Sequence, residues 1–576
     1  MDSFSLNDES SSSEICDSED RIDRKSVSSY RKELKSRSLN MPSILLLIYN
    51  LPVAFCFVLV SNIGYDFTSY FDDSPCTHVP DDDDQIYFSI GDLITRGLFF
   101  LIPFCGWLSD TKIGRGNAIY LSLWLGWIGT LLQSIGCCLQ YNSCGTITYM
   151  IGRFVFPGLA LALLYVSLAF LLTTLIAYGI DQMINDSSVK IRAFIHWLFW
   201  EYFFLDNVAI FLLNTEQKES GALTIPVVAF ALFSFSLCLH FLLKHHFEHI
   251  PIPNPYRIVF KVIKFSLQNN GRQQRSAFTY WGEEPSRMDL AKERYGGSFT
   301  HEEVENVKTF FRILAIMLAT MPFFIVAELL VKDFSRIIVL YDNGHEGLQE
   351  NEDAVIRFIS YGIPLVLIPL FELVIIPLIP KIEYFLINPL KGFGLSNILV
   401  IFSLLTFFII NVSAQKSFDA PCIKWEPGDP AIEVSYWILL IPSVLAGMSD
   451  VLSHICVFEF LCSQAPFGMH GMIIGLFLFL IGISFDIGLT IFLAFQYIFL
   501  LTSCTLWFAI IFCVIALFGL VVYVLVARWY VKRVRDIDLG LRTVIEEHWE
   551  QKVNRKSSSV NYNDDSSNYI ISSIDV

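Results

Sequence analysis

The sequence predicts an all-α membrane protein with about twelve transmembrane helices, and three observations lead to this prediction. Hydrophobic residues make up 54% of the 576 residues and charged residues only 17%, whereas soluble domains carry roughly 25% charged residues. Apolar segments long enough to cross a hydrocarbon layer of about 30 Å recur along most of the chain. A polar stretch at residues 244–306 divides these segments into two sets, which predicts two bundles of about six helices each.

The two predicted bundles occupy residues 43–243 and 307–527. Their helices are expected at about 43–65, 86–108, 117–138, 152–178, 193–213 and 222–243, and at about 308–330, 356–379, 392–413, 435–461, 470–495 and 503–527. Residues 1–42 and 528–576 are polar and lack apolar periodicity, which predicts disordered tails. Residues 244–306 are too charged to enter lipid and form the predicted linker.

Lys and Arg near the helix ends predict that both tails and the linker lie in the cytosol, because positive residues stay on that side of the membrane. The residues that support this orientation are Lys32, Lys35, Arg37, Lys112, Arg115, Lys190, Arg192, Arg528, Lys532, Arg533 and Arg535. Cys76 and Cys144 then fall in loops on the opposite side, where the sequence is compatible with either a disulfide or free thiols. The sequence is compatible with either the plasma membrane or the endolysosomal membrane as the location of the protein.

The composition argues against several classes of function. The net charge of −16 arises mainly from acidic residues at the two ends and in a few loops, which does not favour nucleic-acid binding. Most of the 13 Cys residues lie in apolar segments, and their spacing is not typical of a metal site, so we predict neither a metal nor another cofactor. The predicted helices contain no nucleophile motif or His/Asp cluster suited to catalysis, which predicts that the protein is not an enzyme.

Five segments carry motifs. Residues 106–115 (GWLSDTKIGR) resemble the G-x-x-x-D-x-x-x-G-R loop of major facilitators, in which Asp110, Gly114 and Arg115 would form a turn that latches a neighbouring helix. The others are residues 177–183 (AYGIDQM, with Asp181 and Gln182), 295–300 with 304–308 (YGGSFT and VENVK), 368–377 (IPLFELVIIP) and 459–466 (EFLCSQAP, with Glu459). These resemble, in the same order, segments of the proton-dependent oligopeptide transporter family, so the chain is identified as a divergent member. The resemblance implies the major facilitator fold, whose two six-helix bundles rock about a midplane cavity.

Other positions depart from the family pattern. Family members carry E-x-x-E-R-F in helix 1 for proton coupling and for holding a peptide carboxylate. Aligned through Phe55, this chain has Asn50, Val53 and Ala54 instead. The family's K-P-N in helix 4 is replaced by residues 172–174 (LTT). The proton-binding pair and two basic contacts are therefore missing, and Asn50 is retained as a candidate coupling or substrate position.

Further positions resemble or replace the family's substrate contacts. Asp450 stands for a glutamate that contacts a peptide amino group, Tyr202 matches a cavity tyrosine, and Asp206 replaces an asparagine. Asp206 is equally compatible with a functional role and with an interhelical hydrogen bond. Asp92 and Arg96, spaced i, i+4 in helix 2, either replace part of the lost charge network or form a packing ion pair.

Three more features concern helix contacts. Glu201 points to a different side of its helix from the cavity-matching tyrosine, which predicts a contact with an adjacent helix. Glu459, near the inner end of its helix, is predicted to be a helix-terminus or gate contact. Gly475, Gly482 and Gly488 predict close helix packing.

The leading hypothesis is a secondary active transporter that moves a small organic solute by alternating access. The resemblance implies peptides or peptide-like compounds. The acid at Asp450, with both bases missing, predicts amine-bearing or neutral solutes rather than zwitterionic dipeptides. Predicted partners are this solute, protons if coupling persists, the lipid bilayer, and a PDZ-type domain for residues 574–576. The alternative hypothesis is a non-transporting membrane sensor or scaffold that retains the transporter fold.

Overall fold

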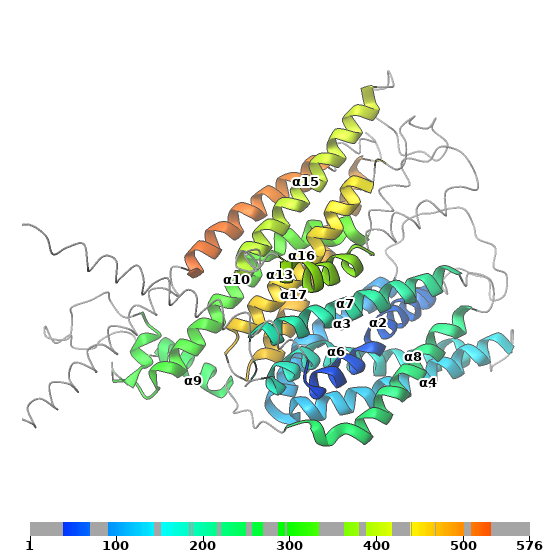
Figure 1. The fold of residues 1–576 in the computed structure, drawn as a ribbon, viewed down its shortest axis with the longest axis horizontal. Coiled ribbons are helices and arrows are strands. Elements are labelled where there is room, and N and C mark those ends of the chain that lie inside the picture. The colour runs from blue at the N-terminus through cyan, green and yellow to red at the C-terminus, as the bar shows by residue number, and fades with distance from the viewer. Residues whose placement is uncertain are drawn as a thin grey trace, which may run out of the picture. The chain divides into compact units, whose positions relative to one another are not determined.

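The computed structural model describes residues 39–68, 90–142, 151–183, 186, 188–215, 221–248, 256–268, 286–293, 296–332, 362–378, 388–416, 438, 440–466, 468–499 and 509–531. Within these ranges the chain is almost entirely helical (Figure 1). The predicted Cys76 and Cys144 loops, most of both tails and the C-terminal PDZ-type motif lie outside them. The contacts reported below all lie in the compact unit that ends at Leu520.

A described helix lies at each position that hydropathy predicts. The first set contains α2 (Met41–Thr68), α3 (Ile90–Leu108), α4 (Arg115–Asn142), α6 (Phe156–Gln182), α7 (Ser188–Thr215) and α8 (Gly221–Leu243). The second set contains α10 (His301–Lys332), a helix over residues 362–378 that includes η8 (Leu370–Ile375) and α13 (Ile376–Leu378), then α15 (Pro389–Lys416), α16 (Leu440–Gln464), α17 (His470–Phe499) and the span Ala509–Val531. Within the described ranges, nine helices are long and apolar enough to cross a membrane. Helix α7 is not among these nine because polar residues, including Glu201 and Asp206, interrupt its apolar sequence.

Side-chain hydroxyl groups join the helices of the first set. Helix α4 packs against α6 and α8, and α2 packs against α6, α7 and α8. Ser167 Oγ donates to the Ser122 carbonyl oxygen at 2.8 Å, and Trp127 Nε1 donates to Ser234 Oγ at 2.9 Å. Because lipid offers no hydrogen-bond partner, such contacts between helices stabilise the set.

The second set uses the same kind of contact. Helix α15 packs along α16, and α10 packs against α16 and α17. Ser403 Oγ donates to the Pro442 carbonyl oxygen at 2.7 Å, and Ser449 Oγ donates to that of Ser396 at 2.7 Å. Small side chains therefore bring α15 and α16 into close contact along their length.

Helix α17 also joins the two sets, because it packs along α3. Gly475 of α17 faces Pro103 of α3, and Gly482 of α17 faces the ring of Phe99, which also lies on α3. Gly488 faces the backbone of Ile325 on α10. The packing role predicted for these three glycines is confirmed.

The predicted linker contains a helix that the sequence analysis did not predict. Helix α9 (Tyr256–Gln268) buries Tyr256, Val259 and Val262, which lie on one face at a spacing of three residues. Charged residues lie between these apolar positions, so hydropathy along the sequence did not predict the helix.

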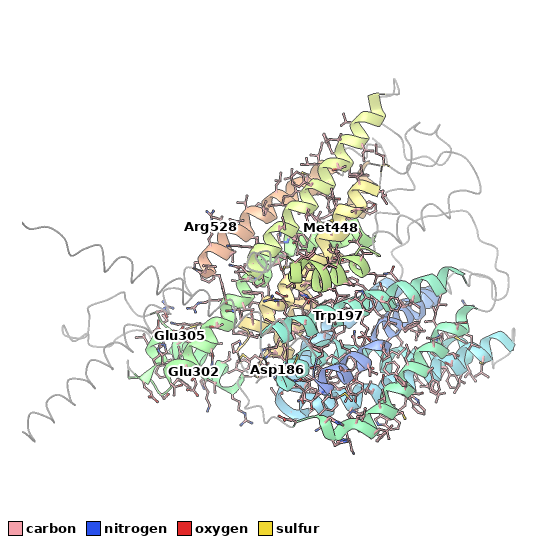
Figure 2. All side chains as sticks on the ribbon, viewed as in Figure 1. Asp186, Trp197, Glu302, Glu305, Met448 and Arg528 are labelled. Carbon is pink, nitrogen blue, oxygen red and sulfur yellow. The ribbon has the colours of Figure 1, made fainter. Side chains whose placement is uncertain are left out.

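An ion network precedes α10. Lys292 Nζ lies 2.7 Å from both Asp289 Oδ1 and Glu305 Oε1, and Lys308 also binds both acids. Figure 2 marks Glu305 in the first turns of α10. Burial acts to raise the pKa of Asp289, but hydrogen bonds from Lys292, Lys308 and Ser286 outweigh it and hold this pKa below its usual range.

A capping box starts α10. Glu303 N–H donates to Thr300 Oγ1 at 3.3 Å, and Thr300 N–H donates to Glu303 Oε2 at 2.9 Å. This reciprocal pair satisfies backbone donors at the helix N-terminus, so the predicted approach to this helix ends in an ordered turn.

Replacing Gly488 by alanine should lower the free energy of unfolding by about 1–3 kcal/mol, because overpacking forces the surrounding structure to move. The added methyl group would press on the carbonyl oxygen of Ile325, which cannot rotate away. The thermal midpoint of the purified protein in detergent measures this effect. Gly97→Ala is the matched control, since no described atom lies within 4 Å of a Cβ added there. An equal loss in the control would contradict the packing argument.

Candidate functional site

A buried ion network lies where α3 ends and α4 begins. The π-helical turn η2 (Ser109–Ile113) and Gly114, whose φ is +83°, bring Asp110 against Arg115. Arg115 Nε donates to Asp110 Oδ1 at 2.8 Å, and Arg115 Nη1 donates to both carboxylate oxygens of Asp181 at 2.7 Å. Arg115 is 2% exposed, and a buried guanidinium needs such partners because an unpaired buried charge is costly.

Asp110 also binds two elements from later in the chain. Met472 N–H, in the first turn of α17, donates to Asp110 Oδ2 at 3.0 Å, and Tyr256 Oη of α9 donates to the same oxygen at 2.9 Å. A helix N-terminus favours an anion, and Gly471 leaves room for this one, since a Cβ there would lie 2.7 Å from Asp110 Oδ1. We call this set the latch: Asp110, Arg115, Asp181, Tyr256 and the N–H of Met472.

The linker is tied to the first set at two points. Gln182 Nε2 donates to the Glu248 carbonyl oxygen, and Glu248 N–H donates to Gln182 Oε1, both at 2.9 Å. Tyr256 forms the second tie through Asp110. Burial, and then the Asp110 carboxylate, raise the pKa of Tyr256 above its usual range, so its hydroxyl group remains a donor at physiological pH. We call the helix ends at these ties the linker side.

Three ionisable side chains from both sets meet between α7, η8 and α16. His196 Nδ1 is hydrogen-bonded to Glu372 Oε1, and His196 Nε2 lies 2.7 Å from Glu459 Oε1. Arg192 Nε, one turn earlier on α7, lies 3.5 Å from Glu459 Oε1. His196 and Glu372 are 2% and 5% exposed. We call His196, Glu372 and Glu459 the bridging cluster; Trp197, next to His196 on α7, is labelled in Figure 2.

Sequence reasoning found this cluster only in part. Glu459 was predicted to be a helix-terminus or gate contact, and its side chain contacts α7; a gating role stays a prediction. Glu372 entered only as part of a motif, and His196 was not singled out. The available signal was an ionisable residue inside an apolar span, which marks a candidate functional position.

Asp450 faces the protein interior. It is 9% exposed, and its Oδ1 lies 3.1 Å from Nδ1 of His454, one turn further along α16. The rings of Phe199 on α7 and Phe324 on α10 lie beside His454, with centroid distances of 6.3 and 5.6 Å. The Asp450–His454 pair therefore lies where α7 of the first set meets the second set.

Asn50 joins α2 to α7. Its Nδ2 donates to the Leu198 carbonyl oxygen at 3.2 Å, and its side chain lies beside the carboxyl group of Glu201. The predicted contact of Glu201 with an adjacent helix is confirmed. A neutral amide thus occupies a position where the family resemblance implied a proton-binding acid.

The remaining predicted positions are only partly described. Tyr202 and Asp206 are half-buried one turn apart on α7, and the Tyr202 ring packs against Phe203 at a centroid distance of 5.8 Å. Asp92 and Arg96 belong to α3, but their side chains lie outside the described part of the structure. The two interpretations of that pair both stay open.

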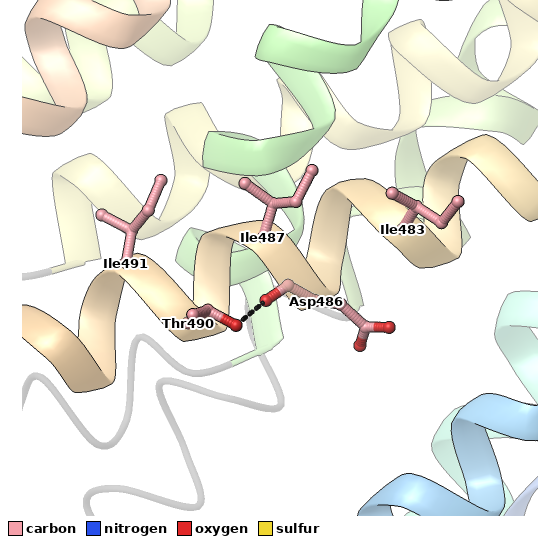
Figure 3. A pocket seen from close by; sticks show the side chains of 5 residues that line it. All are labelled: Ile483, Asp486, Ile487, Thr490 and Ile491. Atoms are coloured by element: carbon pink, nitrogen blue, oxygen red, sulfur yellow. Dashed lines mark hydrogen bonds between the residues drawn. The ribbon is translucent and has the colours of Figure 1, made fainter.

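A shallow hollow of about 240 Å³ lies on α17, lined by Ile483, Asp486, Ile487, Thr490 and Ile491 (Figure 3). Thr490 Oγ1 donates to the Asp486 carbonyl oxygen at 2.7 Å within the helix. None of the predicted binding residues lines this hollow. The midplane cavity beside Asp450 therefore stays a prediction.

Comparison with known proteins finds related sequences. Residues 222–498 match the model of the POT family. Solute carrier family 15 member 3 of Mus musculus is 22% identical over 437 residues, which cover 68% of this chain and 73% of that protein. Protein NRT1/PTR FAMILY 5.15 of Arabidopsis thaliana is 22% identical over 336 residues, covering 54% of this chain and 59% of the plant protein.

Solved structures show the same fold. The POT family transporter PepTSo matches with a TM-score of 0.56 and 16% identity, covering 84% of this chain and 98% of PepTSo. An auto-inhibited POT family peptide transporter matches with a TM-score of 0.50 and 16% identity, covering 85% and 97% of the two chains. The predicted all-α membrane fold is confirmed, and the chain shares it with these two POT family transporters.

Replacing Tyr256 by phenylalanine should lower the free energy of unfolding by about 1.5–3 kcal/mol, the usual contribution of a hydrogen bond to a charged group. In an Asp110→Asn background the same change should cost less, because the charged acceptor is gone. Thermal midpoints of the four proteins in this double-mutant cycle measure the coupling. Tyr120→Phe is the control, since Tyr120 stacks its ring on His240; equal losses in both backgrounds would contradict the proposed contact.

Proposed function

We propose that this chain is a divergent member of the POT family and a secondary active transporter, which moves a small, peptide-like solute across a membrane by alternating access. The observation that carries the proposal is that buried charged groups connect the two sets of helices. Asp110 of the first set binds the N-terminus of α17, and His196 of α7 binds Glu372 of the second set. Polar contacts between two bundles are the kind that open and close when the bundles rock.

The charges near the predicted cavity favour an amine-bearing or neutral solute. Asp450 supplies a buried carboxylate, which suits an ammonium group. Where the family resemblance implied basic contacts, this chain has Ala54, which is buried, and Leu172, which is half-buried. A solute carboxylate therefore lacks the two bases that would hold it, and zwitterionic dipeptides should bind poorly.

A second candidate function is a membrane sensor or scaffold that binds a solute without moving it. The contact of Asn50 with the Leu198 carbonyl oxygen favours this alternative, because a neutral amide there cannot carry a proton. Flux separates the two functions: a sensor would show ligand-dependent stabilisation in a thermal-shift screen but no solute entry into vesicles.

The proposed topology places both tails and the linker in the cytosol, with boundaries at residues 43–243, 244–306 and 307–527. The Lys and Arg residues at the helix ends support it. Epitope tags at either terminus should be reached by antibody once the plasma membrane is permeabilised, even where an endolysosomal membrane stays intact. A tag inserted within residues 417–437 should be reached from the opposite side, and the reverse pattern would overturn the orientation.

Asp450→Asn should lower uptake of an amine-bearing solute into proteoliposomes by roughly 10- to 100-fold, the loss expected from one charge-assisted contact. Initial rates with labelled solute measure this effect. Asp186→Asn, at an acid paired with Lys190, is the matched control. Strong proton-driven accumulation of ordinary zwitterionic dipeptides by the unmodified protein would refute the proposed substrate class.

A further inference from the structure

The geometry of the bridging cluster sets the number of protons it must hold. Both ring nitrogens of His196 face carboxylate oxygens, since Nδ1 contacts Glu372 and Nε2 lies 2.7 Å from Glu459 Oε1. A neutral imidazole carries one N–H, and an ionised carboxylate can only accept. One of the two contacts would then set two lone pairs against each other, so the arrangement requires one further proton.

This proton lies either on the second ring nitrogen or on one of the two carboxyl groups. In both cases a hydrogen stands between the ring and each glutamate. Groups this close titrate as a unit, so the proton belongs to the cluster rather than to a single residue.

The charges around the cluster also favour the extra proton. Arg192 adds one positive charge beside Glu459. His196 and Glu372 are almost fully buried, where added negative charge is costly, so loss of the proton from the cluster is unfavourable. Cys456 and Cys462 of α16 are further titratable groups close to Glu459.

The proton connects the two sets of helices. His196 belongs to α7 of the first set, whereas Glu372 and Glu459 belong to the second. When the proton leaves, one contact becomes repulsive, and separation of α7 from η8 or from α16 relieves the repulsion. Proton binding therefore favours the state in which the sets are joined at this cluster.

We propose that the bridging cluster is the proton-binding site through which a proton gradient drives transport, with the proton bound while the two sets are joined there. The cluster takes the place of the acid pair absent from helix 1, where this chain has Asn50 and Val53. This inference rests on the proposed transport function. It adds the residues that carry the coupled proton.

Glu459→Gln tests the site directly. The glutamine amide can donate to one ring nitrogen while His196 donates its single N–H to Glu372, so the joined state no longer requires the extra proton. A gradient of one pH unit supports about tenfold accumulation per coupled proton. Unmodified protein in proteoliposomes should reach this level, and Glu459→Gln should lose it while gradient-free exchange falls much less. Glu302→Gln, at an exposed position in the first turn of α10, is the matched control.

A second measurement needs no solute. The native cluster binds a proton that the unfolded chain releases more readily, so the thermal midpoint should fall as pH rises through the release of this proton. Glu459→Gln should flatten that part of the pH profile. Glu372→Gln follows the same proton logic and serves if the first variant does not fold.

The two measurements separate the inference from the proposed function. One outcome is that the unmodified protein moves no solute while Glu459→Gln and Glu372→Gln flatten the pH profile and Glu302→Gln does not. In that case the transport function fails and the proton site stands. If the unmodified protein transports and the variants accumulate solute to the same level, the proton site is overturned and the transport function stands. Identical pH profiles for unmodified protein and both variants would also overturn the site.

Discussion

A charge inside a membrane must be paired, because lipid offers it neither a hydrogen-bond partner nor water. Most of the polar contacts in this structure follow from that constraint. Arg115 lies between the carboxylates of Asp110 and Asp181, and His196 lies between two glutamates. Because these partners come from different helices, pairing the charges also determines which helices touch. The positions of the paired charges, and not apolar packing alone, therefore determine where the two sets of helices contact each other.

The latch and the bridging cluster connect the sets by different chemistry. The latch uses the Arg115 guanidinium, which stays charged at any physiological pH, and the backbone N–H of Met472. The bridging cluster is built around the imidazole of His196, a group that gains and loses its proton near neutrality in water. The latch therefore depends on a permanent positive charge, whereas the proton inferred for the bridging cluster can leave it. Loss of that proton would therefore weaken one connection and leave the other in place.

Helix α7 carries much of the polar chemistry that helix 1 lacks. The side-chain amide of Asn50 on α2 donates to the Leu198 carbonyl oxygen and is not ionisable. An acid, Glu201, therefore lies on α7, whereas the family pattern places an acid on α2 at the position of Asn50. His196 lies on the same helix, one turn from Arg192. This concentration of polar residues distinguishes α7 from the nine membrane spans of the described ranges, among which it is not found.

The sequence alone determined where the helices lie and which residues form the turn before α4, because hydropathy and turn motifs depend on neighbours along the chain. Asp450 and Glu459 were also found by resemblance, whereas α9 was missed because its apolar face is surrounded by charged residues. Only the tertiary structure decided the partners of the buried charges. His196 is 176 positions from Glu372 and 263 from Glu459. Contacts over such separations depend on how whole helices pack, which no local pattern records.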